Sequence, residues 1–334
     1  MPKRIAIFRA LNLGDLLCAV PSFRALRRAY PDAHIALISL PWAQEFVDRF
    51  PAYLDEFILF PGWPGLPGQP LDPPRTVQFL QAMQARQWDV VLQQQDNGSL
   101  ANTLLALVGA AAVGGFHPTD QPEWFAVRPD LFMPYPEGEH EIRRHVRLMS
   151  FLGISDQGYD LEFPLTDDDR TAARPLQTTH GLSPGSYVCM HPGGVSGRRW
   201  PAANFARVGN ALAEYGLTIV LTGTPGEQPV VQEVRDQIRF PTVSVVGKTS
   251  LGTLSVLLRE SAMLISNDTG VSHVAAANAV NSVIVFTSAD PAQWAPLDAG
   301  RHRVVHETEP DAVERVILEA TRFLPPTRAP RAER

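Results

Sequence analysis

Short apolar runs alternate with longer amphipathic segments along the first half of the chain. The runs predict strands, and the segments between them repeat apolar residues at helical spacing. Strands separated by helices indicate parallel strands joined by right-handed crossovers, which is an α/β sheet. The longest apolar stretch, residues 104–113, is expected to form a buried helix. The predicted strands are 4–8, 34–39, 57–60 and 89–93, and the predicted helices are 14–30, 42–50, 76–86, 99–108 and 139–152.

A second series of the same kind occupies the other half. Between the two series, residues 153–186 are polar and contain three prolines, so we place a domain boundary there. The expected domains are residues 1–170 and 171–324, each doubly wound and facing a central cleft, with 325–334 as a flexible tail. The predicted strands are 187–191, 218–222, 243–246, 263–266 and 282–286, and the predicted helices are 202–215, 228–238, 251–260, 271–278 and 311–323.

Composition narrows the class of protein. The 334 residues suit two domains, and 29 Lys and Arg against 35 Asp and Glu give a net charge of −6, which disfavours nucleic acid as a partner. Two cysteines, Cys18 and Cys189, exclude a disulfide scaffold. The apolar start is interrupted by Arg9, Asn12 and Asp15 before it reaches the length of a signal peptide. We therefore expect a cytoplasmic protein.

The loop after the first predicted strand carries the first candidate chemistry. A dinucleotide-binding fold would have GxGxxG there, but only Gly14 is present, so a nicotinamide or flavin cofactor is disfavoured and no cofactor is expected. Asp15 lies instead at the start of the following helix. It has two interpretations, a first-turn acid that favours the helix dipole or a general base facing the cleft.

Two loops of the second domain are suited to an anionic ligand. Asp268 and Thr269 can cap a helix that begins at Gly270, whose free N–H groups suit a phosphate, and His273 lies one turn further on. The alternative is an ordinary cap with a core histidine. After strand 187–191, Gly193 and Gly194 free the backbone near a ligand.

Charged side chains near these loops extend the candidate site. Arg198 and Arg199 can neutralise a diphosphate, or they form a solvated pair. Glu227, near the end of the next strand, is placed to accept hydrogen bonds from ribose hydroxyls. Asp167, Asp168 and Asp169 look like a helix cap or a solvated patch, and no metal site is expected.

At these residues the chain resembles the heptosyltransferases of glycosyltransferase family 9, which extend the lipopolysaccharide core. The resemblance runs over roughly residues 3–320, and its most specific part is Asn267-Asp268-Thr269-Gly270 with His273 and the alanines 275–277. Further matching segments are Asn12-Leu13-Gly14-Asp15, His191-Pro192-Gly193, Arg199-Trp200-Pro201, His140-Glu141 with Arg144, and Asp290-Pro291 with Trp294.

The resemblance implies a GT-B fold and an inverting, metal-independent transfer from ADP-L-glycero-D-manno-heptose to an anionic glycan or glycolipid. Asp15 matches the catalytic base, and Asn12, Gly14 and Arg144 are assigned to the acceptor. The residues assigned to the donor are Gly193, Gly194, Arg198, Arg199, Glu227, Thr249, Asp268, Thr269, Gly270 and His273.

Three departures from the family pattern bear on the sugar and the acceptor rather than on the fold. Arg198 stands where a lysine is common, Gln93-Gln94-Gln95-Asp96 replaces an acidic residue followed by Gln-Gly, and Thr287-Ser288-Ala289 replaces Gly-Pro-Thr. Arginines on helices 14–30 and 139–152 suit peripheral contact with the inner membrane or form solvated faces.

Other functions stay open at this point. A family member that uses another nucleotide sugar, or that binds one without turnover, would keep most of these residues. A solute-binding protein would also have two α/β domains, but an exported chain needs the missing signal peptide. A dehydrogenase would need the missing GxGxxG. Among ADP, UDP and GDP sugars, a preference for adenine supports the heptose interpretation and a preference for uridine overturns it. Stabilisation by ADP without sugar transfer to any acceptor favours a non-catalytic binder.

Overall fold

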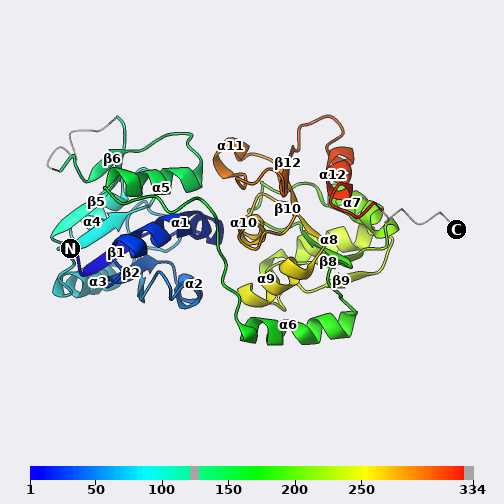
Figure 1. Cartoon of the computed structure of the whole chain (residues 1–334), viewed down its shortest axis with the longest axis horizontal. Helices are drawn as coiled ribbons and strands as arrows, with labels where there is room; N and C mark the ends of the chain where they lie inside the picture. The colour runs from blue at the N-terminus through cyan, green and yellow to red at the C-terminus, as the bar shows by residue number, and fades with distance from the viewer. Residues whose placement is uncertain (121–127, 327–334) are drawn as a thin grey trace. The chain divides into compact units, whose positions relative to one another are not determined.

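The computed structural model describes residues 1–120 and 128–326, and the chain divides into two compact units (Figure 1). The first is Met1–Asp160 and the second begins at Leu161. The boundary expected between residues 170 and 171 falls inside helix α6 (Asp167–His180), which packs against α9 (Leu251–Glu260) of the second unit. The tail expected at 325–334 lies mostly outside the described residues.

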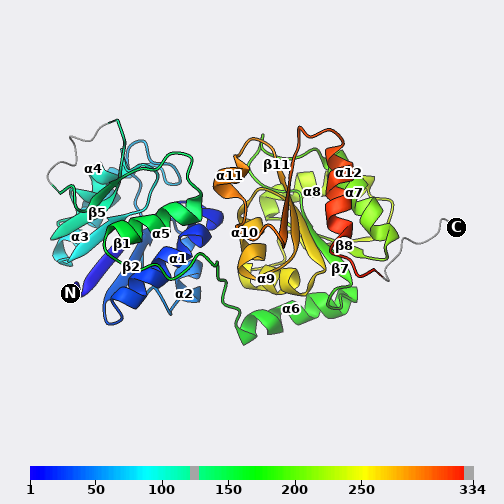
Figure 2. The same ribbon diagram turned by 45° about the horizontal axis from the view of Figure 1, so that its top comes forward.

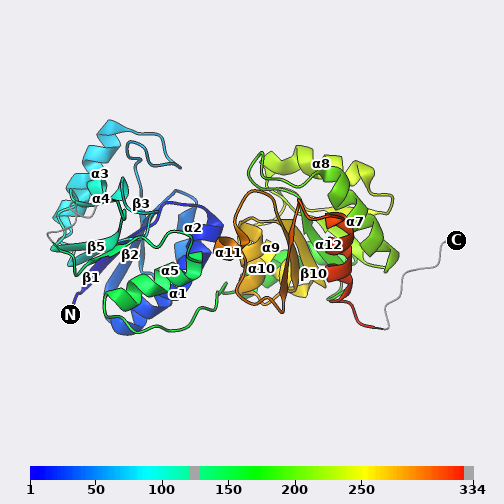
Figure 3. The ribbon, with the colours of Figure 1, turned by 90° about the horizontal axis from the view of Figure 1, so that it is seen from above.

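The first unit is built on one parallel sheet of six strands, in the order β3-β2-β1-β4-β5-β6. Its central strands are continuous apolar runs, because helices cover both faces. Figure 3 shows α1 and α5 side by side on one face and α3 and α4 on the other. The strands are β1 (Arg4–Phe8), β2 (His34–Ser39), β3 (Glu56–Leu59), β4 (Val90–Gln93), β5 (Ala112–His117) and β6 (Phe132–Pro134), and the helices are α1 (Leu13–Ala29), α2 (Ala43–Arg49), α3 (Pro73–Ala85), α4 (Ala101–Leu105) and α5 (Glu141–Phe151).

The second unit repeats this arrangement with the strand order β12-β11-β10-β7-β8-β9. Figure 2 shows α7, α8 and α12 over one face and α9 and α10 over the other, with α6 against α9. Its strands are β7 (Tyr187–His191), β8 (Thr218–Leu221), β9 (Thr242–Ser244), β10 (Met263–Asn267), β11 (Ser282–Phe286) and β12 (His302–His306). Its other helices are α7 (Ala202–Glu214), the 3-10 helix η2 (Pro225–Glu227), α8 (Gln228–Gln237), α10 (Gly270–Ala277), α11 (Pro291–Trp294) and α12 (Ala312–Thr321).

Most predicted elements are confirmed, with bounds that differ by a few residues. The helix expected over 104–113 is wrong, because α4 ends at Leu105, the backbone turns at Gly109 (φ +71°) and β5 begins at Ala112. Five further elements were not predicted, namely β5, β6, β12, α6 and α11. Helix α6 shows no apolar stripe, since only Asp169 and Ala173 are buried in it, and it starts from a capping box between Thr166 and Asp169. Asp169 of the acidic run is therefore part of a helix cap, as expected.

Among the described residues, no helix is long and apolar enough to cross a membrane.

Candidate active site

Both sheets reverse their strand order at one place, which locates the candidate sites. In the first unit the reversal lies between β1 and β4, and in the second between β7 and β10. The loops that leave the carboxyl ends of two such strands diverge, and ligands of doubly wound sheets bind there. The loops with the predicted site residues leave these strands: 9–12 follows β1, 192–201 follows β7, and Asp268 and Thr269 follow β10.

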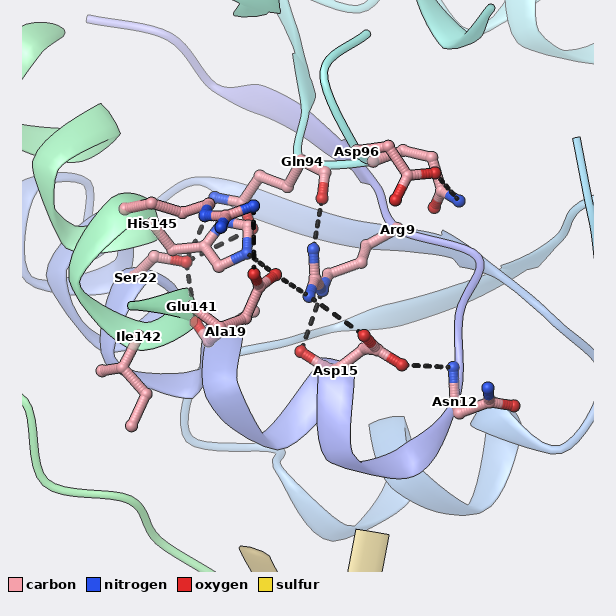
Figure 4. Close-up of polar contacts among 12 residues, drawn as sticks. Arg9, Asn12, Asp15, Ala19, Ser22, Gln94, Asp96, Glu141, Ile142 and His145 are labelled. Atoms are coloured by element: carbon pink, nitrogen blue, oxygen red, sulfur yellow. Dashed lines mark hydrogen bonds and ion pairs between the residues drawn. The ribbon is translucent and has the colours of Figure 1, made fainter. Parts of the chain in front are cut away.

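Arg9 is the centre of the site in the first unit (Figure 4). Its side chain is 1% exposed, and its guanidinium bridges three segments. Nε donates to the backbone oxygen of Asp15 at 2.9 Å, and Nη2 donates to Oε1 of Glu141 at 2.8 Å. Nη1 donates to the backbone oxygen of Gln94. One buried cation thus joins the start of α1, the loop after β4 and the start of α5.

Asp15 lies on the first turn of α1 and keeps 18% of its side chain exposed. Its Oδ2 accepts a hydrogen bond from the backbone N–H of Asn12 at 3.1 Å, which fixes the carboxylate at the helix start. Its Oδ1 lies 3.8 Å from Nη2 of Arg9. Burial raises the pKa of the Asp15 carboxyl, Arg9 opposes that effect, and Glu141 adds to it. Asp15 therefore takes part in the cap of the helix and is also a partly exposed, partly desolvated carboxylate.

The remaining residues predicted for the acceptor differ in accessibility. Asn12 is exposed at the N-cap of α1, and Gly14 is buried in its first turn. Arg144 is 1% exposed, with Nη1 3.2 Å from Oε2 of Glu141 and Nη2 donating to the backbone oxygen of Glu139 at 2.7 Å. Burial is the main reason that the pKa of Arg144 falls to about 10. These contacts favour a structural role for Arg144 over direct contact with an acceptor.

In the second unit, Asn267 at the end of β10 holds the glycine loop in place. Its Nδ2 donates to the backbone oxygens of Pro192 and Gly193 at 3.0 and 2.9 Å, and its Oδ1 accepts the N–H of Trp200 at 2.9 Å. The side chain is fully buried. Asn267 thus satisfies three backbone groups of the loop 192–200, which leaves β7 without regular partners there.

Neighbouring side chains leave no room for a Cβ atom at Gly193 or Gly194. A Cβ on Gly193 would collide with the Glu227 carboxylate, and a Cβ on Gly194 (φ +122°) would come within 2.7 Å of the Thr269 methyl group. The loop after β7, the η2 turn and the start of α10 therefore meet at one place. Gly193, Gly194, Glu227 and Thr269, all predicted for the donor, are brought together there.

Glu227 connects two backbone segments. Its Oε1 accepts the N–H of Gly194 at 2.5 Å, and its Oε2 accepts the N–H of Thr224 at 2.7 Å. Burial would raise the pKa of Glu227, but His191 and these hydrogen bonds lower it below its usual value. His191 is buried, which lowers its own pKa. Glu227 is thus a carboxylate that shapes the glycine loop, with 12% of its side chain exposed to a ligand.

The start of α10 has a polar atom without a partner. The Oγ1 of Thr269 is buried and makes no hydrogen bond to any described residue, although Thr269 occupies the N-cap position. Gly270 follows as the first helical residue, and Asp268 is partly exposed. His273 is 3% exposed within the helix. An unsatisfied hydroxyl beside a glycine loop and a helix start is typical of a site that a phosphate completes.

The remaining donor residues lie around this centre. Nε of Arg199 donates to the backbone oxygen of Gly194 at 2.7 Å, so Arg199 supports the glycine loop. Arg198 is exposed, and its guanidinium makes no hydrogen bond or ion pair with the part of the chain that the structure describes. Thr249 is half-buried in the loop before α9 and has no recorded contact with the other predicted residues.

The arginines expected to face a membrane are largely occupied within the first unit. Arg24 donates to the backbone oxygens of Gly158 and Asp160, and Arg27 pairs with Asp55 at 2.6 Å. Arg28 is exposed. Arg143 stacks over Tyr159, and Arg147 pairs with Glu139 at 3.2 Å.

Three residues at this place were not predicted as site residues, namely Arg9, Glu141 and His145. The usable signal was weak: Arg9 is a charge directly after an apolar strand, and Glu141 and His145 are one helical turn apart. Arg9 and Glu141 are 132 positions apart in the sequence, so no local pattern predicts their contact. Within residues 1–120 and 128–326, no group of three or more His, Cys, Asp or Glu is placed to hold a metal ion.

Comparisons with known proteins identify the family of the chain. A family model described as glycosyltransferase family 9 (heptosyltransferase) matches residues 76–320. Lipopolysaccharide heptosyltransferase 1 of Escherichia coli O18:K1:H7 is 25% identical over 299 residues, which cover 86% of this chain and 87% of that protein.

Solved structures show the same fold. A glycosyltransferase family 9 protein from Veillonella parvula has a TM-score of 0.79 at 22% identity, covering 96% of this chain and 97% of its own. An Escherichia coli structure described as ADP-heptose lps heptosyltransferase II has a TM-score of 0.74 at 18% identity, covering 96% and 98%. The two-unit α/β architecture is therefore that of GT-B transferases, as expected.

Proposed function

The chain belongs to glycosyltransferase family 9, the heptosyltransferases, and from this premise we propose that it moves a heptose from ADP-L-glycero-D-manno-heptose to a sugar of the lipopolysaccharide core. The chain is a glycosyltransferase; the donor, the acceptor and the roles of individual residues are the proposal. Relatives named as lipopolysaccharide heptosyltransferases and a neighbour named for ADP-heptose support this donor and this acceptor class.

The reaction is a direct displacement with inversion. An acceptor hydroxyl oxygen attacks the anomeric carbon and forms the new glycosidic bond. The bond from that carbon to the diphosphate oxygen breaks, and ADP leaves with the electron pair. The hydroxyl proton passes to the carboxylate of Asp15.

The observation that carries the proposal is the state of Asp15. Its carboxylate is partly exposed and is fixed by the backbone N–H of Asn12. Burial increases the proton affinity of this carboxylate. A general base works best when its pKa approaches the working pH. The raised pKa of Asp15 therefore favours a general base over a residue that only caps the helix.

The departing diphosphate gains negative charge in the transition state. The Thr269 hydroxyl, the N–H groups at the start of α10 and the free guanidinium of Arg198 are suited to receive that charge. Glu227 has 12% of its side chain exposed and is suited to a ribose hydroxyl. These groups supply the stabilisation without a metal.

Asp15→Asn tests the base directly. The amide keeps the size of the side chain and its acceptor oxygen for Asn12, so folding should be retained while proton acceptance is lost. We expect the kcat of heptose transfer to fall about 10²- to 10⁴-fold, with ADP affinity unchanged. Asp48→Asn, an exposed acid on α2, is the matched control.

Transfer by Asp15→Asn at the wild-type rate would show that Asp15 is not the base. Binding of ADP without transfer to any acceptor by the wild-type chain would favour a non-catalytic binder. A preference for uridine sugars would reject the proposed donor.

A further inference from the structure

Arg9 lies near two carboxylates, those of Glu141 and Asp15, and its contacts with them differ in length. Nη2 donates to Oε1 of Glu141 at 2.8 Å, whereas the same nitrogen lies 3.8 Å from Oδ1 of Asp15. The contact with Glu141 is short enough for a hydrogen-bonded ion pair, and the contact with Asp15 is not. Figure 4 shows Arg9 between the two acids, with Glu141 on α5 and Asp15 on α1.

Glu141 is itself held firmly. Its Oε1 also accepts a hydrogen bond from Nε2 of His145 at 3.1 Å, and its Oε2 pairs with Arg144 at 3.2 Å. Burial alone would raise the pKa of Glu141, but the hydrogen bond from His145 and the charge of Arg9 lower it to about 2. Burial lowers the pKa of His145 to about 4. Near neutral pH, Glu141 is therefore an anion and His145 is neutral.

Asp15 belongs to a group of charges at the starts of α1 and α5, to which Asp96, after β4, adds a further acid. Arg9 and Arg144 carry two positive charges, and Glu141 and an ionised Asp15 carry two negative ones. Three charged residues act on Asp15 from the segments around it: Arg9 at the end of β1, Glu141 on α5 and Asp96 after β4. Arg9 favours the ionised form, whereas Glu141 and Asp96 favour the protonated form.

We propose that Glu141 is a positioning residue that takes the close ion pair of Arg9, so that Asp15 is oriented by this arginine without being neutralised by it. The inference rests on Asp15 being the base. In a direct pair with Arg9, Asp15 would be a weaker proton acceptor. With Glu141 as the close ion-pair partner of the guanidinium, the arginine still fixes α1 through the Asp15 backbone oxygen.

Glu141→Gln tests this role. The amide preserves shape but leaves Arg9 with Asp15 as its nearest anion. We expect the acidic limb of the kcat–pH profile to move down by about one pH unit. We also expect kcat on the plateau to fall roughly three- to tenfold, because a weaker base accepts the proton less readily. The donor KM should be unchanged.

The matched control is Glu139→Gln. Glu139 lies two residues earlier, carries the same charge and pairs with the exposed Arg147 rather than with Arg9. It should leave the pH profile in place. A merely structural loss would lower the active fraction in Glu141→Gln without moving the acidic limb.

A charge-balanced variant covers the case in which Glu141→Gln does not fold. Glu141→Gln with Arg144→Gln removes one charge of each sign, and Arg144 is not among the residues that act on Asp15. The acidic limb should again move down. The ¹³C titration of the Asp15 carboxyl in the same variants reads the shift without any turnover.

Two results separate this inference from the proposed function. If Asp15→Asn is inactive but neither Glu141 variant moves the acidic limb or the ¹³C titration, the role of Glu141 is wrong and the base stands. If Asp15→Asn is active, the base assignment itself is wrong.

Discussion

The two units have the same strand order, yet they fill the place where that order reverses with opposite kinds of groups. In the first unit the groups are charged: Arg9 lies between Asp15 and the buried Glu141, and Glu141 also pairs with the buried Arg144. In the second the central groups are neutral, namely the Asn267 amide, two glycines and the Thr269 hydroxyl, and the charged Glu227 and Arg199 bind backbone groups of the same loop. Charges tune the proton affinity of a side chain, whereas neutral groups shape a backbone that receives an anion.

The largest expected effect is on the neutral side of this comparison. Asn267→Ala removes three hydrogen bonds and leaves buried backbone groups of Pro192, Gly193 and Trp200 without partners. We expect the free energy of unfolding of the second unit to fall by about 3 kcal/mol. Urea unfolding of the variant measures this loss, and ADP affinity should fall with it.

Asn278→Ala is the matched control for that change. Asn278 is a partly buried amide at the C-cap of α10 that donates to Ser255 and to the backbone oxygen of Val274. Its loss should cost about 1 kcal/mol and leave ADP affinity unchanged. An Asn267→Ala variant as stable as Asn278→Ala would mean that the glycine loop does not depend on this amide.

The next effect concerns pH and compares His145 of the first unit with His302 of the second, which also contains the buried His191. Burial lowers the pKa of His145 in the first unit and of His302 in the second, each from 6.5 to about 4. Below pH 6.5 the unfolded chain binds a proton that the folded unit does not, so stability is full above pH 6.5 and is lost as pH falls toward 4. Between pH 7.5 and 5, each histidine should cost its unit roughly 2 kcal/mol.

Each of the variants His145→Gln and His302→Gln should flatten the pH dependence of its own unit alone. Hydrogen exchange followed by mass spectrometry, corrected for intrinsic rates at each pH, reports the two units separately. Loss of pH dependence in both units from a single variant would show that they do not titrate independently.

The sequence predicts the neutral site better than the charged one. Gly193, Gly194, Thr269 and Gly270 lie in loops directly after apolar strands, so their convergence follows from the parallel sheet alone. The contact of Gly193 with Glu227 needs only that β7 and β8 be neighbours. Local pattern and topology together are sufficient for these residues.

The charged site depends on packing that no local pattern contains. Arg9 reaches Glu141 only because α1 and α5 lie side by side on one face of the sheet. Arg144 was predicted to contact the acceptor, and a charge on an amphipathic helix suggests a solvated or ligand-binding face. Its side chain is buried instead. The same limit explains the missed α6, whose two buried residues form no apolar stripe, and β12, in which two histidines and an arginine flank a single apolar pair.

The smallest expected effect is on ADP binding, and it distinguishes two neighbouring arginines that were predicted to act together on a diphosphate. Arg198 is exposed with a free guanidinium, while Arg199 supports the glycine loop through the backbone oxygen of Gly194. Arg198→Gln should weaken ADP binding about tenfold without changing thermal stability, because it removes one charge-assisted contact to phosphate. Calorimetry at two salt concentrations should show a smaller salt dependence than in the wild type.

Arg199→Gln is the paired variant and should lower both ADP affinity and the melting temperature, since the hydrogen bond to Gly194 is lost. Equal melting temperatures for the two variants would mean that Arg199 does not stabilise the loop. Wild-type ADP affinity in Arg198→Gln would mean that the helix start and the Thr269 hydroxyl hold the diphosphate without this charge. The neutral groups of the second unit would then contribute more to anion binding than Arg198 does, and the contrast with the charged first unit would be sharper than these loops indicate.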